Sequence, residues 1–427
     1  MWDLLVRGGT LFDPLTGTER RGDIAVHQGR IAACGSDLTG AQAAQEVDAT
    51  GRLVTPGLVD IHAHLWSGGG YWGVDLAGIA WRTGVTSWVD AGSAGAFAMS
   101  ALRSAVAASP VSVYALLNVS AVGIPGETGE NRDLENLRVD IGHAEGAAHG
   151  DFVRGVKARM DKRTVGDHGV EPLRRARELA DRLSRPLMVH IGYGPPTVAD
   201  VEPFLREGDI LTHCASGSPT DLVTSAGISP ALRKIAERGV HLDIGHGSGA
   251  FAFDVVETER VAGLTPIIST DLHAVSAHGP AFDMPTVMEK MIAAGWSMAD
   301  VFTAATSRPA SALGLDAGTF DVGARADIAV FQVEEDEHQL VDLHGSSRVA
   351  PLRITNVATI AGGSLLPPVA PQPAPSWVQL STRQRDVWDE QRAELASTSA
   401  PRLSEASDFV EPYPRDHTPT TQETSHA

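Results

Sequence analysis

Two histidines separated by one residue, His62 and His64, are the strongest chemical signal in the sequence. They end an apolar run, PGLVDIHAH, which is typical of a buried strand. Because side chains alternate between the two faces of a strand, both imidazoles point to the same side, as binding to one metal ion requires. The pair therefore predicts a metal site.

Four further potential ligands lie in or at the ends of other predicted strands, namely Lys157, His190, His213 and Asp271. Taken singly, each has an ordinary structural explanation. A lone histidine more often satisfies a hydrogen bond, a lysine can extend to the rim, and an aspartate can cap a helix. All six residues at one end of one set of strands are hard to attribute to coincidence, so we interpret them as a ligand set.

Lys157, in GVKARM, cannot bind a metal ion in its protonated form, because a protonated lysine repels a cation. A neutral lysine can react with carbon dioxide to give an anionic carbamate, whose two oxygens can bridge two metal ions. Burial among Val156, Ala158 and Met160 lowers the pKa of the amine and favours the neutral form. We therefore expect an N6-carboxylysine at position 157 that bridges two divalent ions.

Eight short apolar stretches, with helical segments between them, must position these residues. They cover residues 57–64, 85–92, 111–118, 155–160, 186–192, 209–214, 240–245 and 265–271. Helices are predicted in the gaps, most clearly at 171–184 and 229–239. The rhythm predicts an α/β fold, a (β/α)8 TIM barrel with its active site at the carboxyl ends of the strands. An open doubly wound sheet is the alternative, but no glycine-rich phosphate loop opens a helix.

The domain boundaries follow from changes in pattern and composition. Alternating strands broken by glycine turns fill residues 1–55 and 321–366, and we expect them to form one small β-sandwich domain built from both chain ends. The barrel then occupies residues 56–320. Residues 367–427 are rich in proline, serine and threonine, with one charged segment able to form a helix, and are expected to be a flexible tail.

Composition excludes several classes of partner. The net charge of −19 argues against nucleic acid and anionic membranes as partners. The N-terminus lacks a basic region followed by an apolar stretch, and no run reaches the ~20 apolar residues that span a bilayer. With only 2 cysteines a disulfide framework is not expected. We expect a cytoplasmic enzyme.

The PGLVDIHAH segment resembles the first-strand signature of the amidohydrolase superfamily. The ordered set His-x-His, Lys, His, His, Asp resembles its carboxylated-lysine, binuclear type. Residues 71–96 and the segments DIGHGSGAFAFD and STDLHAVSAHGPAFD are similar to an amidohydrolase/deacetylase subgroup that is often labelled dihydroorotase-like. The resemblance covers residues 1–366.

The resemblance implies a role for each ligand. His62, His64 and Asp271 bind the more buried ion, His190 and His213 bind the more exposed one, and the carboxylated Lys157 bridges both. Zinc is expected from imidazole and carboxylate ligands, with manganese, iron and cobalt as alternatives. A metal-bridging hydroxide attacks the substrate carbonyl, while Asp271 takes the water proton and returns it to the leaving group.

The subgroup resemblance implies cleavage of an acyl bond, amide or ester, in a small acylated carboxylic acid. A cyclic amide hydrolase of the dihydroorotase or hydantoinase type is the alternative, although Arg132, Arg159 and Arg163 are the nearest arginines and none is compelling. A non-catalytic barrel scaffold is the remaining alternative, and it does not explain six intact ligands. The family often forms homo-oligomers, but no motif here specifies an interface.

Five residues are candidate substrate contacts: Tyr71, Trp72, Asn118, His246 and His273. Tyr71 and Trp72 follow the first strand and could form an apolar wall, and Asn118 could donate a hydrogen bond. His246 lies in a glycine-rich loop, and His273 follows Asp271 by two residues. For each of them, packing or support of a neighbour is the competing interpretation.

Overall fold

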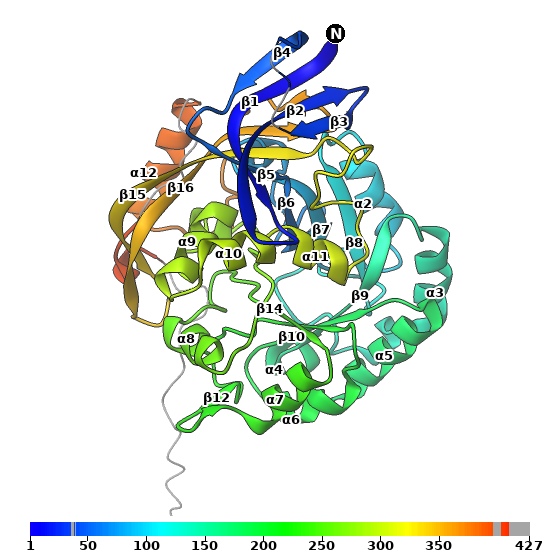
Figure 1. Ribbon diagram of the computed structural model, residues 1–427. Helices are drawn as coiled ribbons and strands as arrows, with labels where there is room; N and C mark the ends of the chain where they lie inside the picture. The colour runs from blue at the N-terminus through cyan, green and yellow to red at the C-terminus, as the bar shows by residue number, and fades with distance from the viewer. Residues whose placement is uncertain (36–37, 39, 396–402, 410–427) are drawn as a thin grey trace, which may run out of the picture.

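A curled parallel sheet forms the centre of the computed structural model, which describes all residues except 36–37, 39, 396–402 and 410–427 (Figure 1). Its seven strands lie in the order β14-β11-β10-β9-β8-β7-β6. They are β6 (Leu58–Ala63), β7 (Val85–Asp90), β8 (Ser112–Asn118), β9 (Val153–Met160), β10 (Leu187–Ile191), β11 (Ile210–Thr212) and β14 (His241–Asp243). Each coincides with a predicted strand. The fold is therefore mixed α/β, of the TIM-barrel type.

The eighth predicted strand, 265–271, is present only as an extended segment. It is joined to the two edge strands by isolated parallel bridges, Ile267 to Asp243 and Leu272 to Ala63. Asp271 has a φ of 45°, in the left-handed region, which interrupts a regular ladder. The segment nevertheless lies between β14 and β6, so that Asp271 at its polar end meets His62 in β6 and His64 just after it.

Helices surround the sheet (Figure 1). The helices predicted at residues 171–184 and 229–239 are present, as α5 (Glu171–Leu183) and α7 (Pro230–Glu237). In α5, Leu173, Ala176 and Leu179 are buried at helical spacing, while its arginines pair with acidic residues on the outer face. The other helices of this part are α1 (Ala77–Ala80), α2 (Met99–Val106), α3 (Val139–Ala148), α4 (Lys162–Val165), α6 (Val198–Val201), α8 (Phe253–Val261), α9 (Met284–Ala293), α10 (Met298–Ala304) and α11 (Ser307–Ala312).

Both chain ends meet in a second, eight-stranded sheet, where β5 pairs with β1 on one side and with β15 on the other. Its strands are β1 (Trp2–Asp13), β2 (Thr18–His27), β3 (Arg30–Gly35), β4 (Ala43–Asp48), β5 (Leu53–Pro56), β15 (Ile328–Val341), β16 (Ser347–Ala361) and β17 (Ser364–Leu365). A separate apolar core, including Leu4, Ile24 and Ile328, holds the two ends together. The packing of this sheet as a sandwich stays a prediction.

The structure differs from the expected flexible tail over residues 367–395. This segment contains α12 (Thr382–Ala393), and the indole of Trp388 is only 5% exposed. Trp81 donates to the carbonyl of Val369 at 2.9 Å, and Gln384 donates to the carbonyl of His278 at 3.1 Å. Composition obscured this docking because a few apolar anchors within a proline-rich run suffice for it. Residues 396–402 and 410–427 of the expected tail lie outside the described residues.

Replacing Trp388 by alanine is expected to lower the free energy of unfolding by about 3–5 kcal/mol. The indole is buried, and its ring centroid lies 4.3 Å from that of His278. Chemical denaturation measures the change, with Trp377→Ala as the control because Trp377 is 49% exposed. Equal, small effects of the two substitutions would show that α12 does not dock on the barrel.

No helix among the described residues is long and apolar enough to cross a membrane.

Candidate metal centre

The first part of the centre is a compact group of His62, His64 and Asp271. Their potential ligand atoms all lie within 4.8 Å of one another. The Nε2 atoms of His62 and His64 lie 3.4 and 3.3 Å from Oδ1 of Asp271. That oxygen is buried and has no partner with hydrogen-bond geometry among the described residues. A buried, unsatisfied carboxylate oxygen facing two imidazole nitrogens fits a bound cation.

Polar neighbours orient both imidazoles from behind. His62 Nδ1 lies 2.9 Å from the hydroxyl of Thr212, and His64 Nδ1 lies 2.9 Å from the hydroxyl of Ser93. The Nε2 atoms are thereby directed toward Asp271. Support of this kind fixes the ring and the tautomer of a metal-binding histidine.

Lys157 projects from β9 into the same group. It is 1% exposed, and its Nζ lies 3.0 Å from Nε2 of His62. Burial lowers the pKa of Lys157 to about 8, so that a minority of the amine is neutral at pH 7, far more than for a lysine with its ordinary pKa. An amine in this state is suited to reaction with carbon dioxide.

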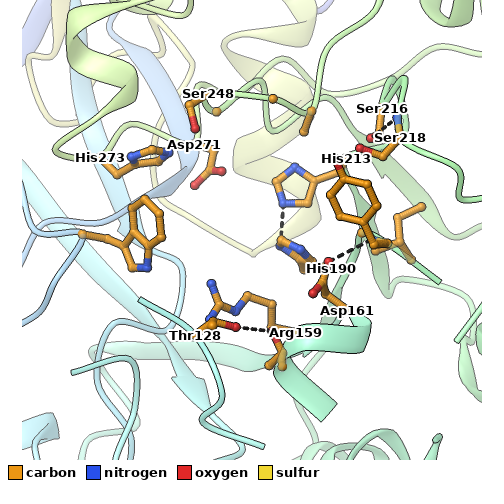
Figure 2. Close-up of a pocket in the computed structure, with 18 of the residues that line it drawn as sticks. Thr128, Arg159, Asp161, His190, His213, Ser216, Ser218, Ser248, Asp271 and His273 are labelled. Carbon is orange, nitrogen blue, oxygen red and sulfur yellow. Dashed lines mark hydrogen bonds between the residues drawn. The ribbon is translucent and has the colours of Figure 1, made fainter. Parts of the chain in front are cut away.

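His190 and His213 form the second part of the centre. His190 lies in β10 and His213 directly follows β11, and the Nδ1 of the former is 2.7 Å from the Nε2 of the latter (Figure 2). Burial lowers the pKa of His213 to about 4 and that of His190 well below its usual value. Both imidazoles are therefore neutral at neutral pH, as metal ligands must be.

The structure brings all six predicted ligands to the wall of one cavity of about 150 Å³. They comprise four imidazoles, one carboxylate and one lysine, carried by β6, the residue after β6, β9, β10, the residue after β11 and the segment before Leu272. The set offers the nitrogen and oxygen donors that a divalent transition metal prefers. The donor chemistry thus fits the predicted ions.

Two of the five predicted substrate contacts, Trp72 and His273, line this cavity. Their rings meet edge to face, with centroids 4.7 Å apart. Tyr71 instead packs beside Trp377, with ring centroids 6.2 Å apart. Trp72 and His273 therefore form one continuous stretch of wall next to Asp271.

The side chains of Asn118 and His246 make contacts outside the cavity wall. The amide of Asn118 donates to the carbonyl of Gly92 and accepts from the backbone N–H of Ser120, each at 2.9 Å. The ring of His246 is stacked on Phe251 with centroids 4.7 Å apart, and its Nε2 lies 2.9 Å from Nζ of Lys290. Neither side chain is part of the described cavity wall.

Sequence reasoning missed much of the remaining wall: Ile124, Thr128, Asp161, Thr164, Tyr193, Ser216, Ser218, Ser248, Leu343 and His344, while Arg159 and Arg163 were considered without being assigned. Leu343 and His344 come from the tip of the β15–β16 hairpin, far away in the sequence. The signal available for Arg159 was its position two residues after Lys157 on the same strand face. The loop residues carry no periodic signal.

The chain is similar to known proteins over most of its length. The sequence model of the amidohydrolase family matches residues 53–354 of this chain. A deacetylase from Agrobacterium fabrum is 34% identical over 74% of this chain and 79% of its own length. A deacetylase from Enterococcus faecalis is 30% identical over 85% of this chain and 99% of its own.

Solved structures show the same likeness over most of the chain. A crystal structure of an adenine deaminase superposes with a TM-score of 0.81 at 31% identity, covering 86% of this chain and 99% of that one. One of a dihydroorotase gives a TM-score of 0.79 at 31% identity, covering 85% and 97%. These relatives share the fold and carry different activities in their names. The chain belongs to the amidohydrolase family and is a hydrolase that acts on C–N bonds.

Proposed function

We propose that this hydrolase is a binuclear metal-dependent deacylase that removes the acyl group, most readily acetate, from a small acylated carboxylic acid. The observation that carries the proposal is the convergence of all six ligand residues on one cavity. The names of the two deacetylase relatives support an acyl group as the part of the substrate that is removed.

In this proposal His62, His64 and Asp271 would hold one ion, His190 and His213 would hold the other, and a carboxylated Lys157 would serve as a ligand to both. Zinc is the expected metal. Two such ions, when bound, supply a water of lowered pKa and polarise a carbonyl group. The protein's own contribution is to fix the ligand geometry and to move protons.

Asp271 is the residue that we assign to proton transfer. Burial alone would raise the pKa of this carboxyl group, but interactions with His62, His64 and His273 outweigh it and hold the pKa well below its usual range. Asp271 is therefore ionised at neutral pH. It can accept the proton of the attacking water and return it to the departing nitrogen or oxygen.

Two matched substrate sets test the proposal, using zinc-loaded enzyme supplemented with bicarbonate. One set contains acetylated amino acids and 2-acetoxy acids in both configurations, and the other contains cyclic amides including dihydroorotate. We expect release of acetate from members of the first set. Ring opening alone would favour a dihydroorotase-like activity. No hydrolysis of either set by enzyme with two ions bound would contradict small acylated carboxylic acids as the substrate class.

Removal of metal by a chelator is expected to abolish turnover and to lower the melting temperature. Ions that bind only the folded chain stabilise it, so the melting temperature depends on their concentration. Elemental analysis of the purified protein is expected to give two divalent ions per chain, with turnover restored when zinc is returned. A barrel scaffold without catalytic function would instead purify without stoichiometric metal and melt at the same temperature after chelation.

A further inference from the structure

We propose that Arg159 is the anchor for the substrate's carboxylate, and that Trp72 and Ile124 form the adjoining apolar wall for its side chain. This inference rests on the proposed deacylase function and names the subsite that selects the substrate. Arg159, Trp72 and Ile124 all line the cavity that holds the six ligand residues.

The guanidinium of Arg159 is held rigidly by a buried partner. It donates to both carboxylate oxygens of Glu130, at 2.8 and 2.7 Å, and Glu130 is only 2% exposed in this pair. Charge-assisted, two-point hydrogen bonding of this kind fixes the plane of the guanidinium. A cation that is already ordered loses little further entropy when it binds a second carboxylate.

Arg159 and Trp72 share a backbone partner. Nη2 of Arg159 and Nε1 of Trp72 both donate to the carbonyl of Glu127, at 3.2 and 3.1 Å. The loop after β8 thus places a cation and an aromatic edge next to each other. Ile124, 3% exposed, belongs to the same loop and extends the apolar surface.

The position of Arg159 on β9 places it next to two of the ligand residues. It lies on the same face of β9 as Lys157 and is in register with His190 of β10. Figure 2 shows its side chain reaching from β9 into the cavity beside Thr128, with Asp271 and His273 across the cavity from it.

A negative group that enters this cavity therefore meets a fixed cation in the same cavity wall as the ligand residues. The arrangement fits an acylated acid in which the carboxylate and the scissile acyl group are close together, as in an N-acyl amino acid or a 2-acyloxy acid. An apolar substituent on the same carbon would face Trp72 and Ile124.

The test compares every acid of the acetylated set with its own primary carboxamide, which keeps the shape and removes the charge. Wild-type enzyme is expected to prefer the acid by about 10²-fold in kcat/KM. A double variant, Arg159→Met with Glu130→Gln, removes both charges and leaves no buried carboxylate unpaired. It is expected to lose the preference, so that its kcat/KM for the acid is similar to its kcat/KM for the carboxamide.

Arg154→Met is the matched control, because Arg154 lies on the same strand and its guanidinium packs 4.7 Å from the ring of Tyr114. This variant should keep the preference for the acid. Calorimetric binding of the deacylated acids and their carboxamides gives a readout that does not depend on turnover. There the double variant is expected to lose its preference for the acid as well.

The outcomes separate the two proposals. Acetate release with no preference for the acid, or an equal loss on acid and carboxamide in the double variant, would overturn the Arg159 subsite and leave the deacylase intact. Arg159-dependent binding of the acids without acetate release would uphold the subsite and overturn the deacylase. Absence of both would overturn both.

Discussion

Asp271→Asn is expected to lower kcat by about 10³-fold while the fold and the metal content are retained, because loss of a general acid–base costs 10²–10⁴-fold. Asparagine keeps an oxygen in the position of Oδ1, which faces His62 and His64. It cannot accept a proton from water at neutral pH. The chemical step should therefore fail, while KM changes little.

Three measurements on the Asp271→Asn variant make this result interpretable. Steady-state kinetics gives kcat and KM, elemental analysis gives the metal content, and the melting temperature reports the fold. Asp254→Asn is the matched control, since Asp254 is an exposed carboxylate paired with Arg348. Near-normal turnover of metal-loaded Asp271→Asn enzyme would contradict the assignment, whereas loss of metal together with activity would limit Asp271 to a ligand role.

The ligand residues were predictable because each lies in, or directly after, a short apolar strand. Strand periodicity places His62 and His64 on one face, and the parallel arrangement brings the ends of β6, β9, β10 and β11 together. Strand periodicity is a local property of the sequence, and the parallel arrangement follows from the order of strands and helices. Of the eight central strands predicted from the sequence, seven are present in the sheet.

In the loops beyond the strand ends the side chains follow no regular alternation, so their directions could not be predicted from the sequence. His246 illustrates the point, since the glycines on either side of it have φ values of 49° and 56°. These left-handed residues turn the chain so that the imidazole stacks on Phe251 instead of facing the cavity. Asn118, at the end of β8, likewise holds the backbone of a neighbouring loop.

Arg159 was missed as a candidate anchor for a different reason. Its orientation depends on Glu130, which lies in the loop after β8 and pairs with it only in the folded chain. The hairpin tip at Leu343 and His344 and the docking of α12 also depend on contacts between segments that are distant in sequence. Such contacts leave no short-range pattern for a sequence to reveal.

Lys157→Ala is expected to lower kcat/KM by about 10³-fold or more, since a bridging anion secures a metal pair worth several kcal/mol of transition-state stabilisation. The Nζ atom is buried, with His62 at 3.0 Å and the sulfur of Met188 at 3.2 Å. Its addition to carbon dioxide forms a C–N bond and releases one proton, which gives the proposed carbamate. A small carboxylate such as acetate or propionate, added to the alanine variant, should restore part of the activity.

A buried lysine elsewhere in the chain provides the control. Lys290 is also 1% exposed, and burial lowers its pKa to about 7, yet it contacts His246 and the carbonyl of Pro280 and does not lie among the ligand residues. If burial and a neutral amine were sufficient, both lysines would be carboxylated. Carbon NMR of enzyme loaded with ¹³C-bicarbonate is expected to show one carbamate resonance, absent from Lys157→Ala and retained in Lys290→Met. A resonance that persists without Lys157 would refute the proposed carboxylysine. We expect the neighbouring ligand residues, more than the lowered pKa, to determine that Lys157 is the lysine that becomes carboxylated.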